Sequence, residues 1–133
     1  MRVAEWLSTR PLVARVHCPA WPTDPGHDLW KRDFLGGNGL LSIEFDASVD
    51  ASAVDLFVDS LELFGLGHSW GGYESLALPV DVAHARTLST WQGRGPVVRL
   101  HVGLEDIDDL LVDLAQALQL MEAARSGILK EQV

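Results

Sequence analysis

A serine between glycines is the first feature of this sequence that could carry chemistry. Residues 67–71 read Gly-His-Ser-Trp-Gly and match the G-x-S-x-G pattern of hydrolase nucleophiles. In those enzymes a strand ends at the serine and a helix begins directly after it, which directs backbone N–H groups at the developing oxyanion. Here a helical pattern precedes Ser69 and an alternating, strand-like pattern follows it. We therefore do not expect an α/β-hydrolase, whose large parallel sheet also exceeds what this chain can form.

Arg99 is the second candidate, because it lies in an alternating segment. Alternation places Val98, Leu100 and Val102 on one face of a strand. It places Arg99 and His101 on the other face. A partly buried guanidinium can bind a carboxylate or phosphate through two parallel hydrogen bonds. It can equally form an internal salt bridge with an acidic side chain, and sequence alone slightly favours the salt bridge.

The remaining candidate ligands do not predict a metal site. The five histidines form no H-E-x-x-H or H-x-x-E-H group, and the single cysteine, Cys18, has no partner cysteine. We expect His101 to be a hydrogen-bonded, partly buried side chain. The acidic residues at 105, 106, 108 and 109 fit the positive end of a helix better than a cation site.

Composition narrows the function classes. A net charge of −9 and a pI near 4.8 oppose binding to nucleic acid or to an anionic membrane, because both require basic patches. The single cysteine excludes an internal disulfide framework. The first residues show neither a signal peptide nor a membrane span. We expect a cytoplasmic protein.

Local patterns predict the elements that must position these side chains. Apolar spacing predicts helices over 1–9, which no capping residue precedes, over 50–63, with Asp50 as N-cap, and over 106–127. The sequence also allows a short helix over 26–34. Period-two alternation and short apolar runs predict strands over 12–16, 40–46, 76–80 and 97–102. Helices interspersed with strands and short turns predict an α/β fold, a small and mostly antiparallel sheet with helices on one face.

Three motifs give the sequence a resemblance to a known family. They are Trp-Lys-Arg-Asp-Phe at 30–34, Ser-Trp-Gly-Gly-Tyr-Glu-Ser at 69–75, and Val-Arg-Leu-His-Val-Gly-Leu-Glu-Asp at 98–106. In this order and spacing they resemble the trans-sulfuration enzymes of Cys/Met metabolism, which depend on pyridoxal phosphate (PLP), and among these the cystathionine β-lyases. The resemblance runs from about Val3 to about Met121.

The resemblance implies that residues 1–133 are the C-terminal domain of a fold-type-I PLP enzyme. A larger domain would supply the Schiff-base lysine, the aspartate that pairs with the pyridinium and the phosphate contacts. Lys31 and Lys130 are the lysines of this sequence, and neither matches the motif of the cofactor lysine. We expect no catalytic residue and no bound PLP in this chain alone. The intact family enzymes are homo-oligomers.

The resemblance also implies the substrate site. Arg99 matches the position that binds the substrate α-carboxylate, Ser69 the turn serine that orients the catalytic lysine and the arginine, and Trp70 a wall of the substrate pocket. The implied reaction is β-elimination of L-cystathionine, or of a related sulfur amino acid, to homocysteine, pyruvate and ammonia. We expect the side of the sheet with Arg99 and Ser69 to be a shallow, open and apolar surface that meets the missing domain.

Three alternatives stay open. Trp70 and Tyr73 favour a β-lyase over γ-acting relatives, which more often have a smaller aliphatic residue in place of Trp70. His68 stands where relatives tend to have tyrosine, so the substrate is less certain than the reaction type. The chain could be a γ-acting relative, a non-catalytic remnant, or an interaction module.

Overall fold

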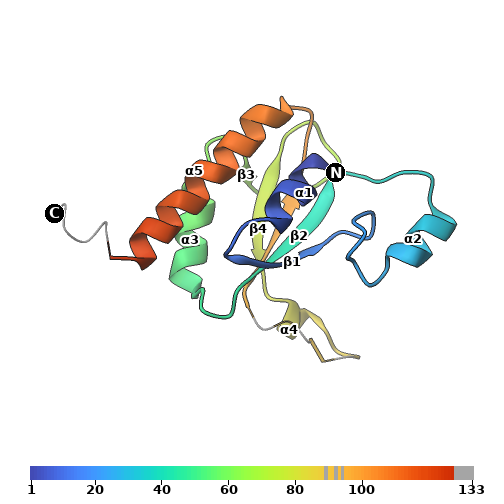
Figure 1. The fold of residues 1–133 in the computed structure, drawn as a ribbon, viewed down its shortest axis with the longest axis horizontal. Coiled ribbons are helices and arrows are strands. Elements are labelled where there is room, and N and C mark those ends of the chain that lie inside the picture. The colour runs from blue at the N-terminus through green and yellow to red at the C-terminus, as the bar shows by residue number, and fades with distance from the viewer. Residues whose placement is uncertain (89, 92, 94, 128–133) are drawn as a thin grey trace.

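Residues 1–88, 90–91, 93 and 95–127 are described by a computed structural model, which contains one five-stranded sheet with helices packed against it (Figure 1). The strands are β1 (Val13–His17), β2 (Leu40–Phe45), β3 (Gly65–Leu66), β4 (Leu76–Val80) and β5 (Val97–His101). The helices are α1 (Arg2–Ser8), α2 (His27–Asp33), α3 (Ala51–Asp59), α4 (Val82–Ala85) and α5 (Ile107–Arg125). The predicted α/β fold is confirmed.

The strands are ordered β1-β2-β5-β4-β3 across the sheet. All neighbouring pairs are antiparallel except β3 and β4. The two-residue strand β3 was not predicted, because two residues cannot display a period. Its pairing stops at Ala77 of β4, which leaves Pro79 beyond the end of β3, where its missing N–H breaks no ladder on that side.

One face of the sheet and three helices enclose the core. Helix α5 contacts both α1 and α3, while α1 contacts β1 and α3 contacts β4, so these helices form one layer. The side chains of Ile43, Phe45, Val98 and Leu100 are fully buried beneath it. Phe45 meets Phe57 of α3 edge to face, with ring centroids 5.4 Å apart. The expectation of helices on one face is confirmed for this layer.

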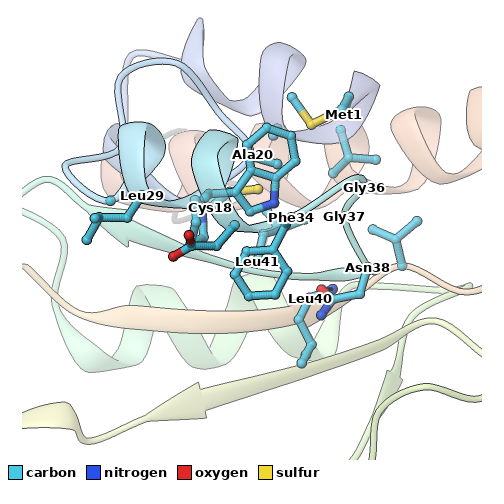
Figure 2. A pocket seen from close by; sticks show the side chains of 18 of the residues that line it. Met1, Cys18, Ala20, Leu29, Phe34, Gly36, Gly37, Asn38, Leu40 and Leu41 are labelled. Carbon is cyan, nitrogen blue, oxygen red and sulfur yellow. Dashed lines mark hydrogen bonds between the residues drawn. The ribbon is translucent and has the colours of Figure 1, made fainter.

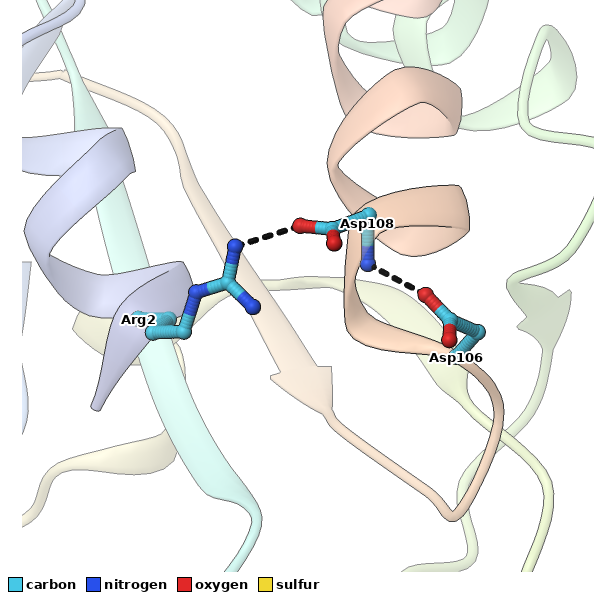
Figure 3. A network of polar contacts seen from close by, with 3 residues as sticks. All are labelled: Arg2, Asp106 and Asp108. Carbon is cyan, nitrogen blue, oxygen red and sulfur yellow. Dashed lines mark hydrogen bonds and ion pairs between the residues drawn. The ribbon is translucent and has the colours of Figure 1, made fainter.

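Aspartates cap helices α3 and α5, and the cap at Asp50 was predicted. Asp50 accepts a hydrogen bond from the N–H of Ala53 at 2.9 Å at the start of α3. Asp106 accepts one from the N–H of Asp108 at 2.8 Å at the start of α5 (Figure 3). Asp108 in turn pairs with the guanidinium of Arg2 in α1. This polar network connects the start of α1 with the start of α5.

Two helices lie outside this layer. Helix α2 buries none of its residues and stands apart from α3 and α5 in Figure 1. The four-residue helix α4, capped by Asp81, follows β4 directly and was not predicted. Among the described residues, no helix is long and apolar enough to cross a membrane.

Candidate functional site

The face of the sheet opposite the helices carries Arg99. In the register of the central strands, Arg99 of β5 lies between Ser42 of β2 and Leu78 of β4. Its neighbours along β5, Val98 and Leu100, are fully buried on the helix side, while Arg99 is half-buried. The prediction that Arg99 points away from the apolar packing of its strand is confirmed.

The guanidinium of Arg99 binds backbone carbonyls. Its Nη2 donates to the carbonyl oxygen of His68 at 2.6 Å and lies 3.5 Å from that of Ser69. Within the described ranges no carboxylate forms an ion pair with Arg99, and neither Nε nor Nη1 has a hydrogen-bond acceptor there. The internal salt bridge that sequence alone slightly favoured is therefore absent from this part of the chain. The Nε–H and Nη1–H groups are available to an external anion.

Ser69 and Trp70 lie on an exposed loop, residues 67–75, which we call the site loop. No described residue forms a hydrogen bond with the Ser69 hydroxyl, and 61% of Trp70 is exposed. Contrary to expectation, a strand (β3) does precede Ser69, but no helix follows it. The structure thus brings the backbone of Ser69, rather than its hydroxyl, to Arg99, and it lacks the nucleophile turn of a hydrolase.

His101 contacts the middle of the site loop. Only 5% of His101 is exposed, and its Nε2 lies 3.1 Å from both the N–H of Gly71 and the carbonyl oxygen of Gly72. One ring nitrogen either accepts or donates, so the tautomer decides which of the two bonds forms. The prediction of a hydrogen-bonded histidine is confirmed, and His101 is more deeply buried than expected.

Ser75 and Glu105 close the end of the site loop. Glu105 accepts hydrogen bonds from the N–H and the Oγ of Ser75, both at 2.7 Å, and Ser75 Oγ accepts one from the N–H of Gly103 at 2.9 Å. Burial opposes ionisation of Glu105, but the bonds from Ser75 outweigh it and hold the pKa of the carboxyl below its ordinary value.

This pair was not predicted from the sequence. Glu105 was expected to belong to the acidic group at the helix end, whereas it binds Ser75, 30 positions away in the chain. One signal for it was present in the sequence. Ser75 stands directly before an apolar strand, and a hydroxyl that is buried there needs a hydrogen-bond partner.

A large hollow lies elsewhere, between α1, α2 and the start of β2 (Figure 2). Its volume is about 900 Å³, and its lining is mainly apolar, with Leu29, Phe34 and Leu41 among the side chains shown. None of Arg99, Ser69 and Trp70 lines it. The hollow and the Arg99 face are therefore separate features of the surface.

Comparison with known proteins identifies the family. The sequence profile described as "Cys/Met metabolism PLP-dependent enzyme" matches residues 1–119. The chain belongs to this family. It is 49% identical over 119 residues to the cystathionine beta-lyase of Bordetella avium, an alignment that covers 89% of this chain and 30% of that protein. It is 44% identical over 117 residues to the cystathionine beta-lyase MetC of Escherichia coli K12, covering 86% and 30%.

A solved structure agrees with the fold. The chain superposes on the crystal structure of cystathionine gamma synthase from Xanthomonas oryzae pv. oryzae with a TM-score of 0.76 at 36% identity, covering 91% of this chain and 32% of that one. The present chain is thus similar both to beta-lyases and to a gamma synthase. The chain spans about 30% of the length of the curated relatives.

The family is PLP-dependent, but the described residues do not fit the cofactor. A lysine that forms a Schiff base needs a desolvated, fixed position. Lys31 is exposed on α2, which buries none of its residues, and Lys130 lies outside the described residues. In the described ranges no three His, Cys, Asp or Glu side chains gather as metal ligands. Of the residues predicted for the site, Arg99 has N–H groups without an acceptor in the described ranges, a state that suits anion binding.

Proposed function

We propose that this chain is the C-terminal, substrate-binding domain of a PLP-dependent carbon–sulfur lyase that cleaves L-cystathionine by β-elimination. The products would be homocysteine, pyruvate and ammonia. One observation carries the proposal: a guanidinium without an acidic partner in the described chain lies on an open sheet face, within the motif at 98–106. A cation in that state gains more from an incoming carboxylate than one already paired.

In this proposal Arg99 binds the α-carboxylate of the substrate through two parallel N–H groups. One is the second Nη2–H, since the other Nη2–H donates to the His68 carbonyl, and its partner is Nε–H or Nη1–H. Trp70 forms one wall of the substrate pocket, and its exposed indole supplies apolar area for that contact. The Ser69 hydroxyl, which has no partner in the described structure, orients Arg99 and the catalytic lysine of the larger domain. In this proposal the larger domain carries out the proton transfers.

The larger domain is a required partner in this proposal. It would supply the cofactor and its lysine, and the intact protein would form a homo-oligomer. We therefore expect the chain alone to be inactive and to bind no PLP covalently. The free, buried Cys18 suits a reducing compartment, so we place the protein in the cytoplasm.

A γ-acting enzyme is the second candidate. The similarity to a cystathionine gamma synthase structure favours it. The motif with Trp70 and Tyr73 favours the β-lyase, by the resemblance described above. A non-catalytic remnant or interaction module is the third candidate, and it differs from both by predicting no turnover in any context.

A hybrid enzyme separates the three. Residues of this chain would replace the matching 117-residue segment of the Escherichia coli cystathionine beta-lyase, to which they are 44% identical. Cleavage at the β-carbon of L-cystathionine gives pyruvate and a thiol that is homocysteine, whereas cleavage at the γ-carbon gives a four-carbon keto acid and cysteine. We expect pyruvate and homocysteine. Predominant cysteine would establish γ-cleavage, and a folded, PLP-loaded hybrid without turnover would contradict the proposal.

A further inference from the structure

Side chains of β5 and of the segment that continues it contact the site loop at three successive points. Arg99 binds the carbonyl of His68 near the loop's beginning. His101 binds Gly71 or Gly72 at its middle. Glu105 binds Ser75 at its end. These three side chains stand two and four positions apart in the sequence, and their contacts occur in the same order along the loop.

Backbone bonds add to these contacts, from the N–H of Leu104 to the carbonyl of Tyr73 at 2.8 Å and from the N–H of Gly67 to that of Ala77 at 3.3 Å. Apolar packing contributes little. Residues 68–74 are all exposed, including Trp70 and Tyr73, so the loop lacks buried apolar side chains between Phe64 and Ser75. Gly71 has a φ of +80°, a conformation that reverses the chain readily but contributes no packing. Loops with few buried contacts open at low free-energy cost. Polar contacts therefore hold the loop in place, and His101 and Glu105 supply those that come from side chains at its middle and its end.

The loop in turn fixes Arg99. The 2.6 Å bond to the His68 carbonyl is the strongest contact of the guanidinium, and that carbonyl belongs to the loop. Arg99 is only half-buried, so its long side chain would otherwise sample several rotamers. A guanidinium binds a planar anion through two N–H groups in a fixed geometry. If it is already oriented before the anion arrives, it loses less conformational entropy on binding.

We propose that His101 and Glu105 are positioning residues that hold the site loop on β5 and thereby orient Arg99 for a carboxylate. This inference rests on the carboxylate role of Arg99 proposed above. His101 acts through Gly71 or Gly72, according to its tautomer. Glu105 acts through Ser75, whose hydroxyl also accepts from the N–H of Gly103. Neither residue needs to touch the substrate.

The first test uses NMR on the 133-residue chain and needs no enzyme activity. The variants are His101→Ala, His101→Gln and Glu105→Gln, with His84→Gln and Glu74→Gln as controls on exposed residues. In His101→Ala we expect the Gly71 amide to exchange with solvent roughly two-fold to ten-fold faster, the effect of losing one hydrogen bond. We also expect the Arg99 Nε–H resonance to move.

Rescue distinguishes positioning from general stability. Glutamine can place an amide near the position of Nε2, so His101→Gln should restore the Arg99 resonance at least in part. Glu105→Gln should move it, and neither control should. An Arg99 resonance unchanged in both His101→Ala and Glu105→Gln, with amide spectra of a folded chain, would overturn the inference. So would equal shifts in His101→Gln and His101→Ala.

The second test uses the hybrid enzyme. His101→Ala and Glu105→Gln should raise KM for L-cystathionine more than they lower kcat, because they disturb binding of the carboxylate and not the reacting atoms. A fall in kcat with unchanged KM would overturn the inference. If the unsubstituted hybrid itself is inactive, the proposed function fails, while the NMR test on the chain still decides whether His101 and Glu105 orient Arg99.

Discussion

At the residue scale, Arg99 carries the proposed activity, and its substitution measures that role. Removing one member of a buried, hydrogen-bonded charge pair typically costs about 2–5 kcal/mol. In the hybrid enzyme, Arg99→Ala should therefore lower kcat/KM roughly thirty-fold to several thousand-fold. Arg99→Lys should recover only part of this loss, because an ammonium keeps the charge and lacks the planar fork.

Arg15 provides the matched control for that measurement. It is exposed on β1 of the same sheet, outside the site loop. Arg15→Ala should leave kcat/KM within a factor of about three. If Arg99→Ala also stayed within about three-fold but lowered the melting temperature, Arg99 would be a structural residue and the proposed role would be wrong.

Glu105 gives a pH dependence with a definite sign. Its pKa in the folded chain lies below the ordinary value of 4.5. The carboxylate therefore stabilises the fold above that pH, and this contribution is lost as pH falls through the folded pKa. Urea unfolding should show the wild-type chain more stable than Glu105→Gln near neutral pH, with the difference shrinking below about pH 4.5. Glu74→Gln, in the same loop but exposed, should show no such difference.

At the element scale, Gly103 allows the end of β5 to approach the site loop. A Cβ at this position would lie 2.2 Å from the carbonyl oxygen of Tyr73 and 2.7 Å from the carbonyl carbon of Glu74. Backbone must then move, at a cost of about 1–3 kcal/mol. We expect Gly103→Ala to lower the melting temperature and to disturb the amide resonances of the loop. Gly72→Ala, whose Cβ would meet nothing within 4 Å, should do neither.

Asp113 of α5 holds the segment that follows α3 through hydrogen bonds to its backbone. It is buried, and its carboxylate accepts hydrogen bonds from the N–H groups of Glu62, Leu63 and Phe64, at 2.8 to 3.2 Å, where the chain leaves α3. Asp113→Asn presents an amide donor to these N–H groups. We expect a loss of about 2–4 kcal/mol in the free energy of unfolding. Asp55→Asn, on the exposed face of α3, should stay within about 0.5 kcal/mol.

At the scale of the whole molecule, several large apolar side chains lie exposed. They include Phe34 and Leu35 beside the hollow of Figure 2, and Trp70, Tyr73 and Leu104 around the site loop. Soluble monomers rarely expose large contiguous apolar areas. We expect the isolated chain to bind an apolar dye and to self-associate at high concentration, as light scattering would show.

A double variant tests the source of that association. Phe34→Ser with Leu35→Ser should reduce dye binding and light scattering, whereas Leu88→Ser, at a similarly exposed residue on another part of the surface, should change them less. A strict monomer at high concentration without dye binding would contradict the expectation of an apolar surface.

Local patterns of residues are enough to predict most of the elements and the family. The strands at Val13–His17, Leu40–Phe45 and Val97–His101 and the cap at Asp50 follow from period and residue type, which act over a few positions. Alternation also placed Arg99 on the face opposite Val98. Three motifs in register indicated the PLP-dependent family, which the profile match over residues 1–119 confirms.

Only the tertiary structure decided how these parts meet. The contacts of the site loop with Arg99, His101 and Glu105 join residues about 30 positions apart, so no local pattern contains them. The order of the strands and the short strand β3 likewise depend on pairings between distant segments. The choice between a salt bridge and a free guanidinium at Arg99 was open in the sequence because acidic side chains abound. Within the described residues, the backbone carbonyl of His68 lies closer to the guanidinium than any carboxylate does, and this decides the choice.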